Sequence, residues 1–276
     1  MDGIILIDKE KGITSRDVVN EVSKKLHTKK VGHTGTLDPL ATGLLVLCVN
    51  NGCKLVELLT NHDKDYIAKV KIGIQTDTYD ITGNIIKENN DFSLDKEKLE
   101  KVLLSFNKEY EQTVPIYSSI KVKGKKLYEY ARKNIEVELP SHLVKISNMK
   151  LLDFNNNSFT FSVTVSSGTY IRSLINDIGE TLGIPMTMEE LRRTRVGDYY
   201  VSDGTTVDEL KIIPIIKAIS LPKIEVDDIL YKKVSNGVKI KNIYQEESVV
   251  FTKDNHVVAI YNDCGNNMMK SYRVFK

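Results

Sequence analysis

Residues 30–47 read KVGHTGTLDPLATGLLVL, a glycine-rich loop that leads into a strongly apolar run. The loop holds one acidic side chain, Asp38, followed directly by Pro39, and one histidine, His33. An Asp-Pro pair on its own is typical of a turn initiator. The stretch lacks the Gly-Lys-Ser/Thr ending of a phosphate-binding loop and the spacing of a dinucleotide fingerprint. With one histidine and no nearby cysteine, it does not predict a zinc site either.

The composition of the chain is that of a globular protein without a membrane segment. It has 276 residues, of which 41% are hydrophobic and 28% are charged, and its net charge is +2. No apolar run approaches the length of a membrane span, and the N-terminus resembles neither a signal peptide nor a transit peptide. Three cysteines without metal-site spacing suit a reducing compartment. We therefore expect a cytoplasmic protein without a metal centre.

Apolar periodicity predicts both strands and helices in the first 221 residues. The expected strands cover 3–7, 44–49, 65–73 and 159–168, and the expected helices cover 14–26, 54–59, 94–106 and 170–183. Because these elements do not alternate strictly, we expect an α+β fold with a mixed, largely antiparallel sheet flanked by helices. The last fifty or so residues contain short strands separated by Asn, Asp and Gly turns. The sequence therefore predicts a large domain over 1–221 and a small β domain over 222–276.

Positive charge is concentrated in three stretches of the chain. Residues 117–133, YSSIKVKGKKLYEYARK, carry six basic side chains, one acidic side chain and three tyrosines. Four lysines lie within 24–30 and three arginines within 192–195. Basic side chains can contact phosphates, and interleaved aromatic rings can stack on unpaired bases. One such patch alone is more typical of a solvated charged face, but three patches beside polar loops favour RNA as the partner.

The chain resembles the TruB family of tRNA pseudouridine synthases in a series of ordered motifs. The GHTGTLDPLATG loop resembles the catalytic signature of the family, and the other matching stretches are GIILIDKEKGITS (3–15), KDYIAKVKIGIQTDTYDITG (64–83), VPIYSSIKVKGKKLYEYARKNIEV (114–137), SSGTYIRSLINDIG (166–179) and LRRTRVG (191–197). Two departures, Val114 for a usual proline and Asn134 for a usual glycine, touch no catalytic position. The C-terminal segment resembles an RNA-binding PUA-like domain only weakly.

This resemblance implies a pseudouridine synthase fold with Asp38, Tyr66 and Arg172 as catalytic residues. Asp38 is implied as the carboxylate that acts on the glycosidic bond, and Tyr66 as the group that removes the C5 proton. A buried carboxylate needs a nearby cation to stay ionised, and Arg172 is the matching residue. Attack at the sugar, attack at the base and elimination all remain open as routes. None of the three needs a cofactor or a metal ion.

The resemblance also implies two sets of binding residues. The substrate-binding set is His33, Tyr66, Tyr170, Leu191, Lys9 and Asp80. In this set His33 enters the RNA where the target base has left, and Asp80 alternatively supports the geometry of its loop or pairs with a basic residue. An RNA-clamping insertion spans about residues 114–140. The RNA-binding set is Lys121, Lys125, Lys126, Arg132, Arg192 and Arg193.

The activity implied by the resemblance is the conversion of uridine 55 in the T loop of tRNA to pseudouridine, after the base is flipped out. We expect a stand-alone enzyme of the bacterial type, a monomer that recognises the T-arm stem-loop. One alternative is a synthase that depends on a guide RNA and partner proteins; the compact chain without a long basic tail argues against it. The other is a tRNA-binding chaperone without catalysis. Intact Asp38, Tyr66 and Arg172 argue against a purely binding role, although chaperoning of tRNA folding can accompany catalysis.

Overall fold

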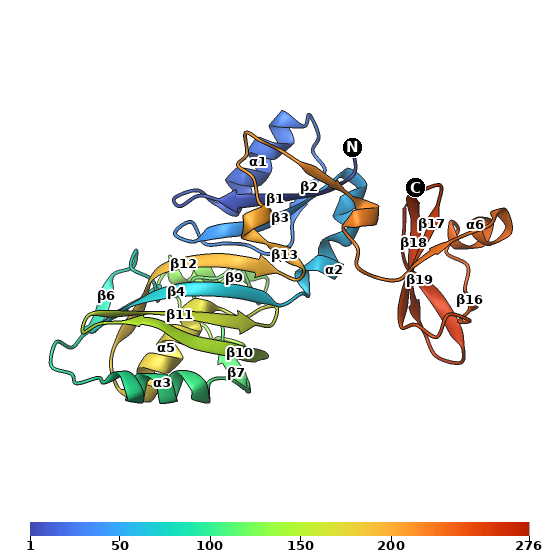
Figure 1. Cartoon of the computed structure of the whole chain (residues 1–276). Helices are drawn as coiled ribbons and strands as arrows, with labels where there is room; N and C mark the ends of the chain where they lie inside the picture. The colour runs from blue at the N-terminus through green and yellow to red at the C-terminus, as the bar shows by residue number, and fades with distance from the viewer. Residues whose placement is uncertain (276) are drawn as a thin grey trace.

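Ten strands form one mixed sheet in the computed structural model, which describes residues 1–275 (Figure 1). The strand order is β14-β1-β3-β12-β4-β11-β10-β7, with β2 paired to β3 and β13 paired to β12. Among the described strand pairs of this sheet only β3–β12 is parallel. The strands are β1 (Gly3–Lys9), β2 (Val31–His33), β3 (Thr42–Val49), β4 (Lys64–Ile72), β7 (Glu109–Thr113), β10 (Ser141–Phe154), β11 (Ser158–Val165), β12 (Met186–Val196), β13 (Tyr199–Tyr200) and β14 (Ile212–Pro214). The expected α+β fold with a mixed, largely antiparallel sheet is confirmed.

The strands β1 and β3 are apolar at nearly every position. Both faces of this half of the sheet are therefore covered by other elements. Side chains of one parity, such as Ile5 and Leu45, pack against Val18 and Val22 of helix α1 (Ser15–Lys25). Side chains of the other parity pack under the 3-10 segment η1 (Asn50–Leu55) and helix α2 (Val56–Thr60). Since successive side chains of a strand point to opposite faces, a continuous apolar run such as LLVLCV is buried on both sides.

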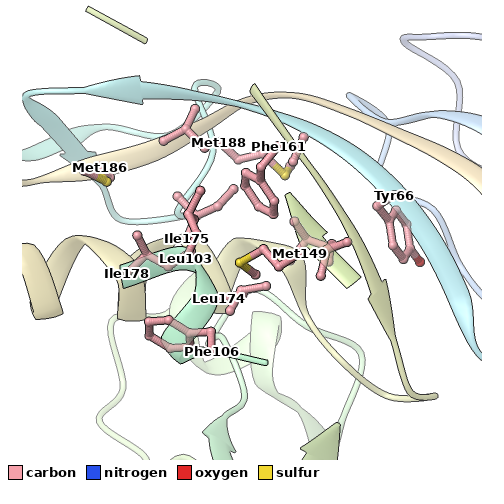
Figure 2. Close-up of a cluster of buried hydrophobic side chains, with 14 of the residues drawn as sticks. Tyr66, Leu103, Phe106, Met149, Phe161, Leu174, Ile175, Ile178, Met186 and Met188 are labelled. Atoms are coloured by element: carbon pink, nitrogen blue, oxygen red, sulfur yellow. The ribbon is translucent and has the colours of Figure 1, made fainter. Parts of the chain in front are cut away.

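The second half of the sheet carries the largest hydrophobic core on the face that helices α3 (Lys96–Ser105) and α5 (Ile171–Leu182) cover (Figures 1 and 2). Figure 2 shows Leu174 and Ile175 of α5 among Phe161 and Met149 of the neighbouring strands. These four side chains are at most 1% exposed. Helix α5 is therefore fixed against the sheet, which also fixes the loop at its N-terminus.

A second sheet of five strands follows the main body (Figure 1). Its order is β15-β17-β18-β19-β16, with β15 (Lys223–Glu225), β16 (Ile240–Lys241), β17 (Ser248–Lys253), β18 (His256–Asp263), β19 (Met268–Val274) and the short helix α6 (Asp228–Val234). It has its own core, and it also contacts the main body, where Val250 and Ile260 pack with Ile4 and Leu55. All its strands start at residue 223 or later, while the functional boundary at 221/222 stays a prediction.

Two short hairpins project from the main body. One joins β5 (Ile74–Thr76) to β6 (Ile85–Glu88), and the other joins β8 (Lys121–Val122) to β9 (Lys125–Lys126) ahead of helix α4 (Leu127–Ala131). The second hairpin lies within the insertion expected near 114–140. In the described part of the chain, no helix has the length and apolar character needed to cross a membrane.

Candidate active site

A cavity of about 360 Å³ opens where five parts of the chain meet. Its lining comes from the loop before β3, the start of β4, the 117–119 segment with Tyr128, the N-terminus of α5, and β12. Six of the predicted site residues line it: Asp38, Tyr66, Tyr170, Arg172, Leu191 and Arg193. β4 and β12 are neighbours in the sheet and α5 packs on it, so residues distant in sequence meet here. Within residues 1–275, no group of three or more His, Cys, Asp or Glu side chains could hold a metal ion.

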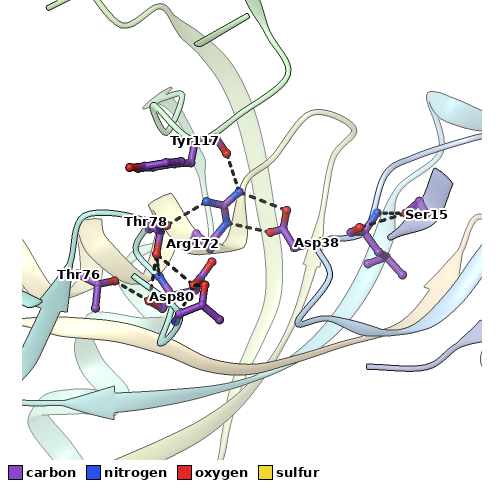
Figure 3. Close-up of polar contacts among 9 residues, drawn as sticks. Ser15, Asp38, Thr76, Thr78, Asp80, Tyr117 and Arg172 are labelled. Atoms are coloured by element: carbon purple, nitrogen blue, oxygen red, sulfur yellow. Dashed lines mark hydrogen bonds and ion pairs between the residues drawn. The ribbon is translucent and has the colours of Figure 1, made fainter. Parts of the chain in front are cut away.

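Asp38 and Arg172 form an ion pair at the wall of this cavity (Figure 3). Nε of Arg172 donates to Oδ2 of Asp38 at 2.8 Å, and Nη2 donates to Oδ1 at 3.3 Å. The Arg172 side chain is 6% exposed and the Asp38 side chain is 34% exposed. A two-point contact of this kind fixes the orientation of a carboxylate as well as its position. Asp38 is therefore held firmly while it remains accessible from outside.

Arg172 also ties the ion pair to two other loops. Its Nη1 donates to the carbonyl oxygen of Thr78 at 2.9 Å, and its Nη2 donates to that of Tyr117 at 3.1 Å (Figure 3). One guanidinium thus contacts the Asp38 loop, the turn after β5 and the start of the insertion. Because these contacts use the fixed fork of donors that arginine offers, the side chain has little freedom to swing away from Asp38.

The loop that carries Asp38 is a true turn as well as a wall of the cavity. The amide of Ala41 donates to the carbonyl oxygen of Asp38 at 3.0 Å, which closes the turn. Ser15 of helix α1 binds Leu37 twice: its Oγ accepts from the amide at 2.8 Å and donates to the carbonyl oxygen at 3.0 Å (Figure 3). Asp38-Pro39 can therefore form a turn and still present a carboxylate to the cavity, because the turn places the Asp38 side chain opposite Arg172.

Lys9 lies behind this loop and does not line the cavity. The residue is 1% exposed, and its Nζ donates to the carbonyl oxygens of Glu10 and Ile13, each at 2.8 Å, and to that of Pro39 at 3.5 Å. Burial lowers the pKa of Lys9 to about 8, although the attraction of Asp38 opposes this shift. The geometry gives Lys9 a supporting position under the Asp38 turn, away from the place where a substrate would lie.

Arg193, which was predicted to belong to the RNA-binding set, is buried and does not lie on an exposed basic surface. It stands opposite Tyr66 in the β4–β12 register and is 1% exposed. Its Nε donates to the carbonyl oxygen of Leu44 at 2.7 Å, its Nη2 to that of Gly35 at 3.0 Å, and its Nη1 to the Tyr66 hydroxyl at 3.5 Å. Gly43, with φ of +102°, permits this close strand approach, because a Cβ there would lie 2.2 Å from the Arg193 carbonyl oxygen. Arg193 is therefore a residue of the cavity floor.

A buried glutamine that the sequence analysis missed holds the start of α5. Gln112 on β7 is 0% exposed; its Oε1 accepts from the Tyr170 amide at 2.8 Å and its Nε2 donates to the Tyr170 carbonyl oxygen at 3.2 Å. The same Nε2 donates to the hydroxyl of Tyr110 at 2.9 Å, which donates to Asp177 at 2.9 Å. Tyr170 is the N-cap of α5 and offers no side-chain cap of its own, so Gln112 fixes the backbone just before Arg172. Burial raises the pKa of the Tyr170 hydroxyl.

Lys64 is a second residue that the sequence analysis missed, and unlike Gln112 it lines the cavity. It is 6% exposed, and its Nζ donates to the carbonyl oxygens of Thr60 at 2.9 Å and His62 at 2.6 Å. Burial lowers its pKa to about 8, with a further contribution from the Arg193 charge. Lys64 stands two positions before Tyr66 on the same strand, hence on the same face, and that spacing was the available sequence signal.

Besides Lys9, two further predicted substrate-binding residues, His33 and Asp80, lie outside the cavity. His33 ends β2, and its Nδ1 is buried without a hydrogen-bond partner among the described residues. Burial lowers the pKa of His33, with the charges of Arg16 and Arg193 adding to the shift. Asp80 is 7% exposed and accepts from the Thr82 amide at 2.9 Å (Figure 3). The alternative in which Asp80 supports the geometry of its own loop fits these contacts.

The predicted RNA-binding lysines lie on the β8–β9 hairpin, and Arg132 follows α4 directly. Lys121, Lys125 and Arg132 are exposed, while Lys126 is half-buried. Two of these cations flank the ring of Tyr128: Nζ of Lys126 at 5.4 Å and Cζ of Arg132 at 5.3 Å from the centroid. Because Tyr128 lines the cavity, this positive surface is continuous with it. Arg192 differs, since it pairs through two hydrogen bonds, at 3.0 and 2.7 Å, with Asp8.

Family models now identify the chain. Residues 23–171 match the N-terminal domain of the TruB family of pseudouridylate synthases, and residues 172–218 match the C-terminal domain of tRNA pseudouridylate synthase B. The chain belongs to the TruB family. This confirms the family resemblance and the enzyme class predicted from the sequence.

Relatives agree with membership of the TruB family, and two solved structures share the fold. The tRNA pseudouridine synthase B of Fusobacterium nucleatum is 42% identical over the whole of both chains. That of Bacillus subtilis is 41% identical over 95% of this chain and 93% of its own. Two structures share the fold with a TM-score of 0.72, over 99% of this chain: an H/ACA RNP bound to a substrate RNA containing 2′-deoxyuridine, at 23% identity and 85% of that chain, and a Cbf5–Nop10–Gar1 complex, at 24% identity and 84%.

Proposed function

We propose that this chain isomerises uridine 55 in the T loop of tRNA to pseudouridine, with Asp38 acting on the glycosidic bond. The observation that carries the proposal is the fixed Asp38–Arg172 ion pair in a cavity that also contains Tyr66, Tyr170 and Leu191. Relatives about 40% identical over nearly their whole length carry the name tRNA pseudouridine synthase B, which supports tRNA as the substrate. The intact pocket favours catalysis over a purely binding role.

The reaction needs a carboxylate beside the N1–C1′ bond, room for the uracil to turn, and a group that removes the C5 proton. Asp38 supplies the carboxylate, by attack at the sugar, by attack at the base or by promoting elimination; the N1–C1′ bond breaks in all three routes, although the atom on which the carboxylate acts differs. Once C5 is joined to C1′, the proton on C5 must leave, and Tyr66 is the group we assign to it. Leu191 and Tyr170 supply the walls that enclose the ring.

The target base must leave its loop to enter a cavity of about 360 Å³. Flipping a base costs about a few kcal/mol, which stacking and pocket contacts must offset. We propose that His33, on β2 outside the cavity, fills the space that the flipped base leaves in the RNA. We also propose that Lys121, Lys125 and Arg132 contact the RNA backbone. We also propose that residues 222–276 are a separate RNA-binding domain. We also propose that the protein acts as a monomer.

Mapping of pseudouridine in tRNA and in a T-arm stem-loop, before and after treatment with the pure protein, tests this function. The expected result is one new pseudouridine at position 55 in both RNAs. Reaction only in the presence of a guide RNA would favour the first alternative. Binding of tRNA without any new pseudouridine would favour the chaperone.

A further inference from the structure

The charges that line the cavity do not balance. Four charged side chains face it: Asp38, Lys64, Arg172 and Arg193. Arg172 forms an ion pair with Asp38, whereas Lys64 and Arg193 form none with any carboxylate in the described part of the chain. The charge of Asp38 is thus balanced by Arg172, and the charges of Lys64 and Arg193 in the same cavity are not balanced by a carboxylate.

These two cations share one corner of the cavity. A Cβ built on Gly35 would lie 3.5 Å from Nη1 of Arg193 and also 3.5 Å from Cε of Lys64. The hydroxyl of Ser167, another lining residue, donates at 2.9 Å to the Thr60 carbonyl oxygen that Lys64 also contacts. A glycine backbone and two cations therefore meet at this corner, with the Ser167 hydroxyl on the same carbonyl oxygen as Lys64, and this composition suits an oxyanion.

Burial of the two charges next to each other has a cost that neutral carbonyl groups offset only in part. A buried charge is normally paired, because its removal from water is unfavourable. The lowered pKa of Lys64, caused by burial and then by Arg193, is consistent with that cost. Both side chains keep free donors: Lys64 uses two of its three N–H groups, and Arg193 uses three of its five.

The position of the corner indicates which anion it would accept. Nη1 of Arg193 lies 3.5 Å from the hydroxyl of Tyr66. The corner is therefore beside the side chain that we assign to removal of the C5 proton of the target uracil. A nucleotide that enters the cavity brings its flanking phosphates with it. We propose that Lys64 and Arg193 form a subsite for one phosphate next to the flipped uridine. This inference rests on the proposed function, and it adds a contact that orients the ribose against Asp38.

The test combines a neutral phosphate with the loss of a charge on the protein. Three T-arm stem-loops are compared: one unmodified, one with a methylphosphonate 5′ to the target uridine, and one with it 3′. Each is assayed with wild type, with Lys64→Met and with Lys71→Met, which removes a lysine from the other face of the same strand. Lys64→Met should lower kcat/KM for the unmodified RNA by about 10- to 100-fold, as expected for a lost charge-assisted hydrogen bond. Lys71→Met should leave it unchanged.

The subsite predicts that the two changes are not additive. One of the two methylphosphonates should lower kcat/KM of wild type about as much as the Lys64→Met substitution does on the unmodified RNA. The same methylphosphonate should lower kcat/KM of Lys64→Met little further. Its position, 5′ or 3′, identifies the phosphate that the subsite binds. Equal loss from Lys64→Met on all three RNAs would give Lys64 a purely structural role and overturn the inference. Wild-type rates unaffected by either methylphosphonate would overturn it even if the variant does not fold. Failure of the proposed function is distinct, since wild type would then convert no unmodified RNA.

Discussion

The guanidinium of Arg172 binds the carboxylate of Asp38 at two points, 2.8 and 3.3 Å, and it also binds the carbonyl oxygens of Thr78 and Tyr117. Two hydrogen bonds fix the one acidic group of the cavity, and the other two hold the Arg172 side chain, which is only 6% exposed. Such an arrangement holds the Asp38 carboxylate in place and leaves it accessible from the cavity, as the proposed function requires.

Asp38→Asn should abolish turnover while tRNA binding stays nearly unchanged. Asparagine keeps the shape of the side chain but cannot act as a carboxylate, and loss of a residue of this kind costs at least about 10³-fold in rate. The measurements are tritium release from C5-labelled tRNA and a filter-binding curve on the same preparation. Activity that survives in Asp38→Asn would contradict the role assigned to Asp38.

Gln112→Ala should lower both stability and turnover, although Gln112 does not line the cavity. The substitution leaves the Tyr170 amide without its acceptor, while the Tyr170 carbonyl oxygen keeps the Leu174 amide as a donor. The unpaired amide should reduce the free energy of unfolding by about 1–3 kcal/mol. The substitution also frees the backbone two residues before Arg172, so we expect kcat to fall more than KM rises.

The control for this prediction is Glu111→Gln, an exposed change on the same strand. Thermal unfolding and steady-state kinetics of both variants give the comparison. If Gln112→Ala loses stability while kcat is kept, then Gln112 serves the fold alone and does not position Arg172.

The apolar strands and amphipathic helices could be predicted from the sequence, whereas the two longest strands, β10 and β12, could not. β1, β3, β4 and β11 have uninterrupted apolar or alternating patterns, and each was predicted close to its observed bounds. Two register shifts occur in β10, at 147–150 and 151–153. Two more occur in β12, at 188–190 and 193–195. A bulge moves the buried face by one residue, so the expected alternation fails along just these strands.

The candidate site divides in the same way. Residues that sit in a recognisable motif, such as Asp38 and Arg172, could be assigned a place, and both line the cavity. Lys9, His33 and Asp80 belong to equally recognisable motifs, yet the fold puts them behind or beside it. Gln112 was missed because a single polar residue in a short strand is expected to be exposed until its partner at the N-terminus of α5 is known.

Replacement of Lys125 and Lys126 by alanine should weaken tRNA binding and flatten its dependence on salt. Both side chains belong to the β8–β9 hairpin, and removal of each lysine–phosphate interaction should reduce the slope of log K against log salt by about 0.7–0.9. The matched control removes Lys98 and Lys101, two exposed lysines of helix α3. An unchanged salt slope in the hairpin variant would place this patch off the RNA.

The lowered pKa of Lys64 predicts a distinct dependence of stability on pH. Burial brings this pKa from 10.5 to about 8 in the folded protein, so the folded state releases the proton before the unfolded state does. Stability then rises with pH where the unfolded state binds more protons. The penalty for burying the charge is fully present below about pH 8 and disappears toward about pH 10. Lys9, whose pKa is also lowered to about 8, contributes in the same window.

Denaturant unfolding of wild type and Lys64→Met at several pH values between about 7 and 10 measures this effect. The free energy of unfolding of wild type should increase relative to that of Lys64→Met as the pH passes 8, because methionine has no proton to lose. Lys71→Met, on the other face of β4, should follow wild type. Parallel profiles for wild type and Lys64→Met would show that Lys64 keeps its ordinary pKa, and the charge imbalance in the cavity would then carry no energetic cost.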